Sequence, residues 1–254
     1  MTKKNDFDED GFVRLPRFLT NLQLVELQQA VERYILEKVP QLKQTDVFFD
    51  NPEKPETLKQ LHRMEQDTFF ANYSRHSHWN KTASDFLGEP VEVLGVEYFN
   101  KPPKTKHETP PHQDNYYFCL APPQVLTIWV ALDYIDEENG CVHYVRGSHR
   151  LGLRQHRLSS TLGFSQCISD YSQSDMDSES KVTCLPGDAV IHHGNTIHRA
   201  GPNLTNNRQR RALAMVFRGK SASRDYQRFN TYLESSNQQQ ASFGIDSKFG
   251  IDSK

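Results

Sequence analysis

The chain has 254 residues, of which 36% are hydrophobic and 24% are charged, with a formal net charge of −2. This composition is that of a globular protein long enough to form one large domain. The lack of a basic excess argues against nucleic acid as a partner. No apolar run approaches the roughly 20 residues that cross a bilayer, so we expect no membrane partner and a cytoplasmic location. The sequence gives no indication of the oligomeric state.

The N-terminal part is predicted to be helical. Thr20 and Gln23 form a capping box, and apolar residues follow at helical spacing as far as Pro40. We expect further helices around residues 58–64 and in the segment that ends at Gly88. Helices within residues 20–88 would therefore support the rest of the fold. We interpret His62, His76 and His78, which are scattered through this part, as solvated surface residues.

From Val91 onward the apolar period changes from helical to alternating, which predicts strands. Further strands are expected at residues 112–120, 125–133, 141–145, 182–184, 189–193, 197–199 and 210–218. Many short strands separated by turns indicate a sandwich or barrel, with the leading helices packed on one sheet. The polar segment 151–181 is predicted to be a mobile loop or lid. The four cysteines are widely spaced, so we expect free buried thiols.

Candidate metal ligands lie in the segment from Pro111 to Phe118. In an extended strand, alternate side chains share a face, so His112 and Asp114 could bind one ion. A third ligand would complete the three-ligand face typical of non-haem Fe(II), and His198 is the best candidate. His192 and His193 compete for this role. They could instead hydrogen-bond to a ligand, or one could point inward at the sheet edge while the other is solvated.

A possible anion site follows twelve residues after His198. Alternation places Arg210 on the same face as the small apolar residues Ala212 and Ala214. A guanidinium in an apolar interior requires an anion, and its planar fork suits a carboxylate. A structural salt bridge would also satisfy it. Because strand register is not visible in a sequence, Arg208 and Arg211 remain possible substitutes.

Several motifs occur together in a fixed order. They are 99–103 (FNKPP), 112–114 (HQD), 129–133 (WVALD), 138–141 (ENGC), 145–149 (VRGSH), 186–188 (PGD) and the segment from His198 to Arg210. In this combination the chain resembles the phytanoyl-CoA dioxygenase family of Fe(II)- and 2-oxoglutarate-dependent oxygenases. The resemblance implies a mainly β fold with supporting helices and a double-stranded β-helix (jelly roll, cupin-like) core. We place the domain at residues 1–236, with its core at 91–218, and expect a disordered tail at 237–254.

The resemblance also implies roles for individual residues. His112, Asp114 and His198 would be the catalytic iron ligands, and Arg210 would hold the distal carboxylate of 2-oxoglutarate. Lys101 and Trp129 match family positions near that cosubstrate, whereas Asn139-Gly140 matches a turn between core strands. The chain departs from the family pattern at Arg146 and Ala200, and its loop between His198 and Arg210 is one residue longer. These departures affect the shape of the pocket but remove no ligand.

The implied reaction uses Fe(II), 2-oxoglutarate and O2, releases succinate and CO2, and hydroxylates a small-molecule or natural-product substrate. We expect Gln113, Tyr116 and Tyr117 to face this substrate. A basic cluster at 150–157 could favour an anionic substrate, although we favour the interpretation of a solvated basic turn. Two alternatives are a cupin-type metal-dependent hydrolase or isomerase and a non-catalytic jelly-roll binding protein.

Overall fold

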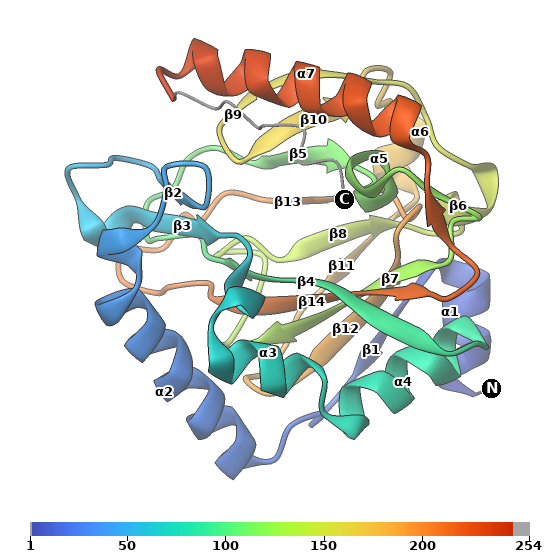
Figure 1. Ribbon diagram of the computed structural model, residues 1–254, viewed down its shortest axis with the longest axis horizontal. Coiled ribbons are helices and arrows are strands. Elements are labelled where there is room, and N and C mark those ends of the chain that lie inside the picture. The colour runs from blue at the N-terminus through green and yellow to red at the C-terminus, as the bar shows by residue number, and fades with distance from the viewer. Residues whose placement is uncertain (1, 246–254) are drawn as a thin grey trace.

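The structure is a computed structural model that describes residues 2–245. Its centre is a seven-stranded antiparallel sheet (Figure 1). In spatial order its strands are β1 (Phe12–Leu15), β12 (Ala189–His193), β7 (Val125–Ala131), β14 (Ala212–Gly219), β4 (Val91–Phe99), β3 (Leu58–Leu61) and β2 (Val47–Phe49). Every residue of β7 is buried, because this strand is covered on both faces.

A smaller sheet faces the inner side of the large one. Its strands are β11 (Glu179–Val182), β8 (Val142–Val145), β13 (His198–Ala200) and β5 (Thr109–His112). Side chains from both sheets form an apolar cluster between them, which includes Trp129 and Ala214 from the large sheet and Tyr144 from the small one. The mainly β fold with a jelly-roll core is therefore confirmed.

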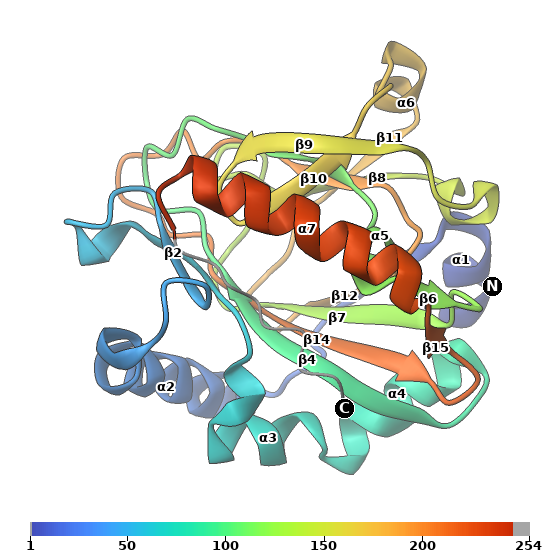
Figure 2. The same cartoon turned by 45° about the horizontal axis from the view of Figure 1, so that its top comes forward.

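Helices cover the outer face of the large sheet (Figures 1 and 2). They are α1 (Lys3–Asp10), α2 (Asn21–Glu37), α3 (Thr68–Ser74) and α4 (Ser77–Leu87), with short 3-10 turns at Val39–Gln41, Pro55–Thr57, Met64–Gln66 and Ser148–Leu151. The predicted capping box is present, because the Thr20 side chain accepts a hydrogen bond from the Gln23 N–H. The predicted end at Gly88 is also confirmed, where φ is 76°.

The prediction of a helix around residues 58–64 is wrong. Leu58 and Leu61 have helical spacing, but they lie on β3, which pairs with β4 through Leu61 and Tyr98. Sheet pairing and burial of both leucines override the local pattern here. His62 follows directly and is not a solvated residue, because its ring packs edge-on against Phe48 with centroids 5.3 Å apart. His76 and His78 are exposed as expected.

The prediction of a mobile loop at residues 151–181 is also wrong. It contains the hairpin β9 (His156–Thr161) and β10 (Phe164–Ile168), then α6 (Gln173–Asp177) and β11. The C-terminal helix α7 (Tyr226–Ser242) lies across this hairpin (Figure 2). The prediction of a disordered tail from residue 237 is therefore wrong as far as Ser242. Residues 246–254, which hold the second copy of the terminal repeat, lie outside the described residues.

Two further observations complete the fold. The cysteines are free and buried, as expected from their spacing. Among the described helices, none combines the length and the apolar character that a bilayer crossing requires.

Candidate active site

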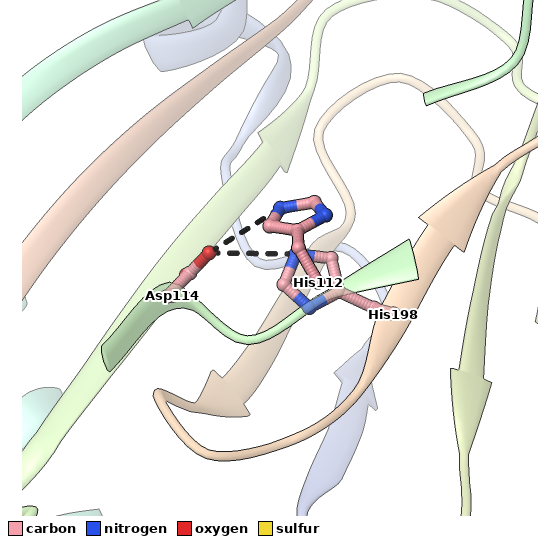
Figure 3. Close-up of side chains that lie close together, drawn as sticks. All are labelled: His112, Asp114 and His198. Carbon is pink, nitrogen blue, oxygen red and sulfur yellow. Dashed lines mark ion pairs between the residues drawn. The ribbon is translucent and has the colours of Figure 1, made fainter. Parts of the chain in front are cut away.

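The three proposed metal ligands lie together between the two sheets (Figure 3). β13 and β5 are antiparallel neighbours, and their register places His198 directly opposite His112. The His112 Nε2 atom is 3.7 Å from the Asp114 Oδ1 atom, and the His198 Nε2 atom is 3.5 Å from it. All three ligand atoms lie within 4.8 Å of one another. Sheet pairing thus joins ligands that are 86 residues apart in the sequence.

The predicted strand through Asp114 is not found. β5 ends at His112, and Asp114 is the first residue of the short helix α5 (Asp114–Phe118). Asp114 therefore reaches the site from a helix start and not by strand alternation. The ligand set is the one the sequence predicted, but the local geometry that was expected to produce it is wrong.

Backbone carbonyls select the tautomer of both histidines. The His112 Nδ1 atom lies 2.8 Å from the Pro110 oxygen, and the His198 Nδ1 atom lies 3.0 Å from the Thr196 oxygen. Because a carbonyl can only accept, each Nδ1 carries the proton and each Nε2 lone pair faces the site. Burial lowers the pKa of His112 and lowers that of His198 to about 3. Both imidazoles are therefore neutral, as metal binding requires.

The second oxygen of Asp114 is held by the protein. Asp114 Oδ2 accepts hydrogen bonds from the Thr127 hydroxyl at 2.8 Å and from His192 Nε2 at 3.0 Å. His192 Nδ1 in turn lies 3.1 Å from the Tyr144 hydroxyl. Burial raises the pKa of Asp114, but the neighbouring His198 and the hydrogen bond from His192 lower it by more than burial raises it. The net pKa is below the usual value, so the carboxylate is ionised. His192 therefore hydrogen-bonds to a proposed ligand, one of the roles that the sequence left open.

Beyond the ligands, two buried cations face the same cavity, which has a volume of about 380 Å³. Arg210 is only 4% exposed, and its Nε atom is buried without a hydrogen-bond partner among residues 2–245. Lys101 is equally buried, and its Nζ atom donates to the His107 carbonyl at 3.1 Å. Burial, followed by repulsion from Arg210, lowers the pKa of Lys101 well below its usual value. Two neighbouring buried cations of this kind favour a bound anion with more than one negative charge.

The other arginines on this segment are already paired. Arg208 contacts Asp136 and Glu138, and Arg211 contacts Asp133. These ion pairs exclude them as substitutes for Arg210.

Trp129 lies beneath Arg210, whose guanidinium carbon is 5.8 Å from the centre of the indole ring. The Asn139-Gly140 turn fits closely against this region, because a Cβ atom on Gly140 would lie 2.6 Å from the Gly201 carbonyl oxygen. With φ at +90°, the turn requires glycine, as the sequence predicted.

The three expected substrate residues have different environments. Gln113 is fully buried, and its amide nitrogen donates to the carbonyls of Gly152 and Asn195. It does not line the cavity, so its contacts assign it a structural role. Tyr116 stacks on His156 at a centroid distance of 3.9 Å, also outside the cavity lining. Tyr117 does line the cavity, with its hydroxyl donating to the Gln166 carbonyl.

The structure adds lining residues that the sequence did not single out. Glu97 projects from β4, and a set of side chains from α7 closes the opposite side; the α7 set is Phe229, Tyr232, Leu233, Ser236, Gln239 and Gln240. The alternation along 91–99 put Glu97 on one face of a strand, which was a usable signal. The α7 residues carried no such signal, because their role depends on how the helix packs on the β9–β10 hairpin.

The family model described as phytanoyl-CoA dioxygenase (PhyH) matches residues 7–212. The chain belongs to the phytanoyl-CoA dioxygenase family. Phytanoyl-CoA dioxygenase 1 of Oryza sativa subsp. japonica is 28% identical over 143 residues, covering 56% of this chain and 50% of that protein. The human peroxisomal phytanoyl-CoA dioxygenase is 23% identical over 217 residues, covering 81% of this chain and 64% of that protein. The chain thus spans about half to two thirds of the length of these two family members.

Solved structures show the same fold. EvdO2 from Micromonospora carbonacea var. aurantiaca, complexed with 2-oxoglutarate, is 27% identical with a TM-score of 0.68, covering 87% of this chain and 91% of that one. The epimerase SnoN in complex with Fe3+, alpha ketoglutarate and nogalamycin RO is 20% identical with a TM-score of 0.72, covering 99% of this chain and 91% of that one. The cavity of this family member therefore lies in a fold that, in EvdO2, is complexed with 2-oxoglutarate and, in SnoN, with Fe3+ and alpha ketoglutarate.

Proposed function

We propose that the protein is an Fe(II)- and 2-oxoglutarate-dependent oxygenase that hydroxylates a small molecule and releases succinate and CO2. The observation that carries this proposal is the presence, in one cavity, of a two-histidine, one-carboxylate ligand set and a buried arginine whose Nε has no hydrogen-bond partner among residues 2–245. The ligand set suits non-haem iron, and the arginine suits the distal carboxylate of 2-oxoglutarate.

The proposed ligands are already in the protonation states that iron binding requires. His112 and His198 present neutral Nε2 atoms, and Asp114 presents an ionised oxygen. When bound, the iron and 2-oxoglutarate supply the dioxygen activation that no amino-acid side chain provides. The protein orients the Asp114 ligand through Thr127 and His192, and Arg210 with Lys101 fixes the cosubstrate anion.

Hydroxylation of a small molecule is the finer part of the proposal. The cavity is lined by aromatic and apolar side chains next to the ligand set, and its size suits a small organic substrate. A relative from Stutzerimonas stutzeri, 23% identical over 215 residues and named a probable alpha-ketoglutarate-dependent hypophosphite dioxygenase, supports oxygenation of a small substrate.

The test measures succinate formed from 2-oxoglutarate with Fe(II) and air, over a panel of candidate substrates. We expect substrate-stimulated succinate formation, which Asp114→Ala abolishes because it removes an iron ligand. Asp85→Ala, an exposed carboxylate paired with Lys81 on α4, is the matched control and should retain full activity.

The outcomes separate the alternatives. A hydrolase or isomerase would turn over its substrate without oxygen or 2-oxoglutarate. A binding protein would hold 2-oxoglutarate but form no succinate. Full activity in Asp114→Ala would refute the ligand assignment.

A further inference from the structure

One carboxylate on the cavity wall takes no part in the proposed metal or 2-oxoglutarate sites. On β4, Val96 and Tyr98 pack into the core beneath the helices, whereas Glu97 lies on the opposite face and lines the cavity. The register pairs Glu97 with Ala214, and Ala214 with Trp129. The small alanine between them leaves the space above the sheet open beside Glu97.

Among residues 2–245, no lysine or arginine forms a salt bridge with Glu97. Within residues 2–245 its carboxylate makes no hydrogen bond, and its nearest ion-pair neighbour is His62 Nδ1, 3.9 Å from Oε1. Burial lowers the pKa of His62 to about 4, so that imidazole is neutral. The nearby Arg63 guanidinium is paired with Asp46. About a quarter of the Glu97 side-chain surface remains accessible, at 27%, so a ligand in the cavity can reach it.

The surroundings of Glu97 favour a positive charge. Burial, and then the charges of Asp114 and Glu65, raise the pKa of Glu97 to about 8, and Arg63 only partly opposes this. The Glu65 carboxylate is itself occupied, because it accepts a hydrogen bond from the Val96 N–H at 2.8 Å. A bound cation would relieve this repulsion and restore the ionised carboxylate.

Much of the rest of this end of the cavity is apolar or already satisfied, and one cation, Arg224, also lines it, stacked on the Phe229 ring at 4.2 Å. Leu94, Phe118 and Phe229 supply apolar surface. The Tyr117 hydroxyl donates to the Gln166 carbonyl, and Tyr232 hydrogen-bonds to side chains on α7 and β10. Aromatic faces near a carboxylate are also favourable surroundings for an ammonium group. Glu97 is thus the carboxylate at this end that makes no hydrogen bond within residues 2–245.

We propose that the substrate carries a protonated amine, whose ammonium group binds the Glu97 carboxylate while its apolar body packs on the aromatic wall. This inference rests on the proposed oxygenase function. It places the amine on the β4 side of the cavity, away from the end that Arg210 and Lys101 reserve for 2-oxoglutarate.

The experiment first asks whether the enzyme forms its cosubstrate complex. Fe(II) and 2-oxoglutarate are added without oxygen, and the visible charge-transfer absorption of the chelate is recorded. Failure of the wild-type protein to form this complex would refute the proposed function, and this inference with it.

The second step titrates that anaerobic complex calorimetrically with three probes of similar shape: phenethylamine, 2-phenylethanol and 3-phenylpropionate. The pH is set at about 8.5, above the Glu97 pKa of about 8 and below that of an alkylammonium, which is about 10. We expect the amine to bind about tenfold more tightly than the alcohol, a factor equivalent to about 1.4 kcal/mol.

Two variants locate the preference. Glu97→Gln should bind amine and alcohol equally, whereas Glu92→Gln, an exposed residue on the same strand that pairs with Arg218, should keep the preference. Equal binding of amine and alcohol by the wild type, tighter binding of the carboxylate, or an amine preference that survives Glu97→Gln would overturn the proposal. If Glu97→Gln does not fold, the wild-type comparison still tests the proposal, because equal binding of amine and alcohol by the wild type would overturn it.

Discussion

The two oxygens of Asp114, a proposed metal ligand, have different surroundings. Oδ1 faces the two histidine Nε2 atoms, and Oδ2 is fixed by Thr127 and His192. A carboxylate on the first turn of a short helix could otherwise rotate about its side-chain bonds. Hydrogen bonds to the oxygen that does not face the metal site remove that freedom before a metal arrives.

Replacing Thr127 with valine tests this support, because it removes the hydroxyl and keeps the side-chain shape. We expect Thr127→Val to weaken metal affinity by about tenfold, within the range typical for groups that support a ligand. Calorimetric titration with Mn(II) in place of Fe(II) measures the change without turnover. Thr82→Val on α4, whose hydroxyl bonds to the His78 carbonyl, is the control; an equal loss in both variants would contradict the role of Thr127.

For these residues, the sequence predicted which side chains form the proposed site more accurately than it predicted their backbone geometry. The ligand types and their order identified His112, Asp114 and His198, although Asp114 lies on a helix start and not on a strand. Gln113 was wrongly expected to face the cavity, because its position between two ligands says nothing about the backbone groups that hold it. Side-chain direction near a strand end depends on where the strand stops, which local alternation does not reveal.

Among the elements, α7 changes the picture of the cavity most. Its docking depends on Gln239, whose amide nitrogen lies 2.8 to 3.1 Å from the carbonyls of Ser159, Thr161 and Phe164 on the hairpin. A polar, glutamine-rich segment gave no apolar pattern to indicate a packed helix. Burial of such a side chain is favourable only when the hairpin supplies acceptors, and that arrangement is tertiary.

Removing this amide should loosen the helix. We expect Gln239→Ala to destabilise α7 by about 1 to 3 kcal/mol, because buried carbonyls lose their donor. Hydrogen exchange of the α7 backbone amides measures the effect locally. Gln238→Ala, at the exposed neighbouring position, is the matched control. Unchanged exchange in Gln239→Ala would show that other contacts hold the helix.

The whole molecule encloses several neutral histidines, and this gives its stability a defined pH dependence. His62, His156 and His193 each have a pKa lowered to about 4, chiefly by burial. His156 illustrates the constraint: its Nδ1 atom donates to the Arg154 carbonyl, and its Nε2 atom accepts from the Gln113 N–H. Protonation of Nε2 would remove that acceptor, so the native state resists it.

The direction of this pH dependence follows from how many protons the native and unfolded states bind. In the unfolded chain these imidazoles have pKa values of about 6.5, so between about pH 6.5 and 4 the unfolded state binds protons that the native state does not. The free energy of unfolding therefore falls as the pH falls through this range, by at most about 1.4 kcal/mol per pH unit for each imidazole. Glu97 has the opposite effect between about pH 8 and 4.5, because its raised pKa makes the native state bind the extra proton. Three imidazoles outweigh one carboxyl.

Urea unfolding of the metal-free protein at a series of pH values measures this slope. We expect stability to decrease from about pH 6.5 toward pH 4, and His156→Gln to reduce the slope because one of the contributing imidazoles is absent. His76→Gln, at an exposed position, should leave the slope unchanged. A stability that is constant or increases over this range would contradict the neutral state of the buried histidines. The same neutrality keeps the His112 and His198 nitrogens available to a metal, so the slope and the proposed metal site depend on one physical cause, the burial of imidazole rings.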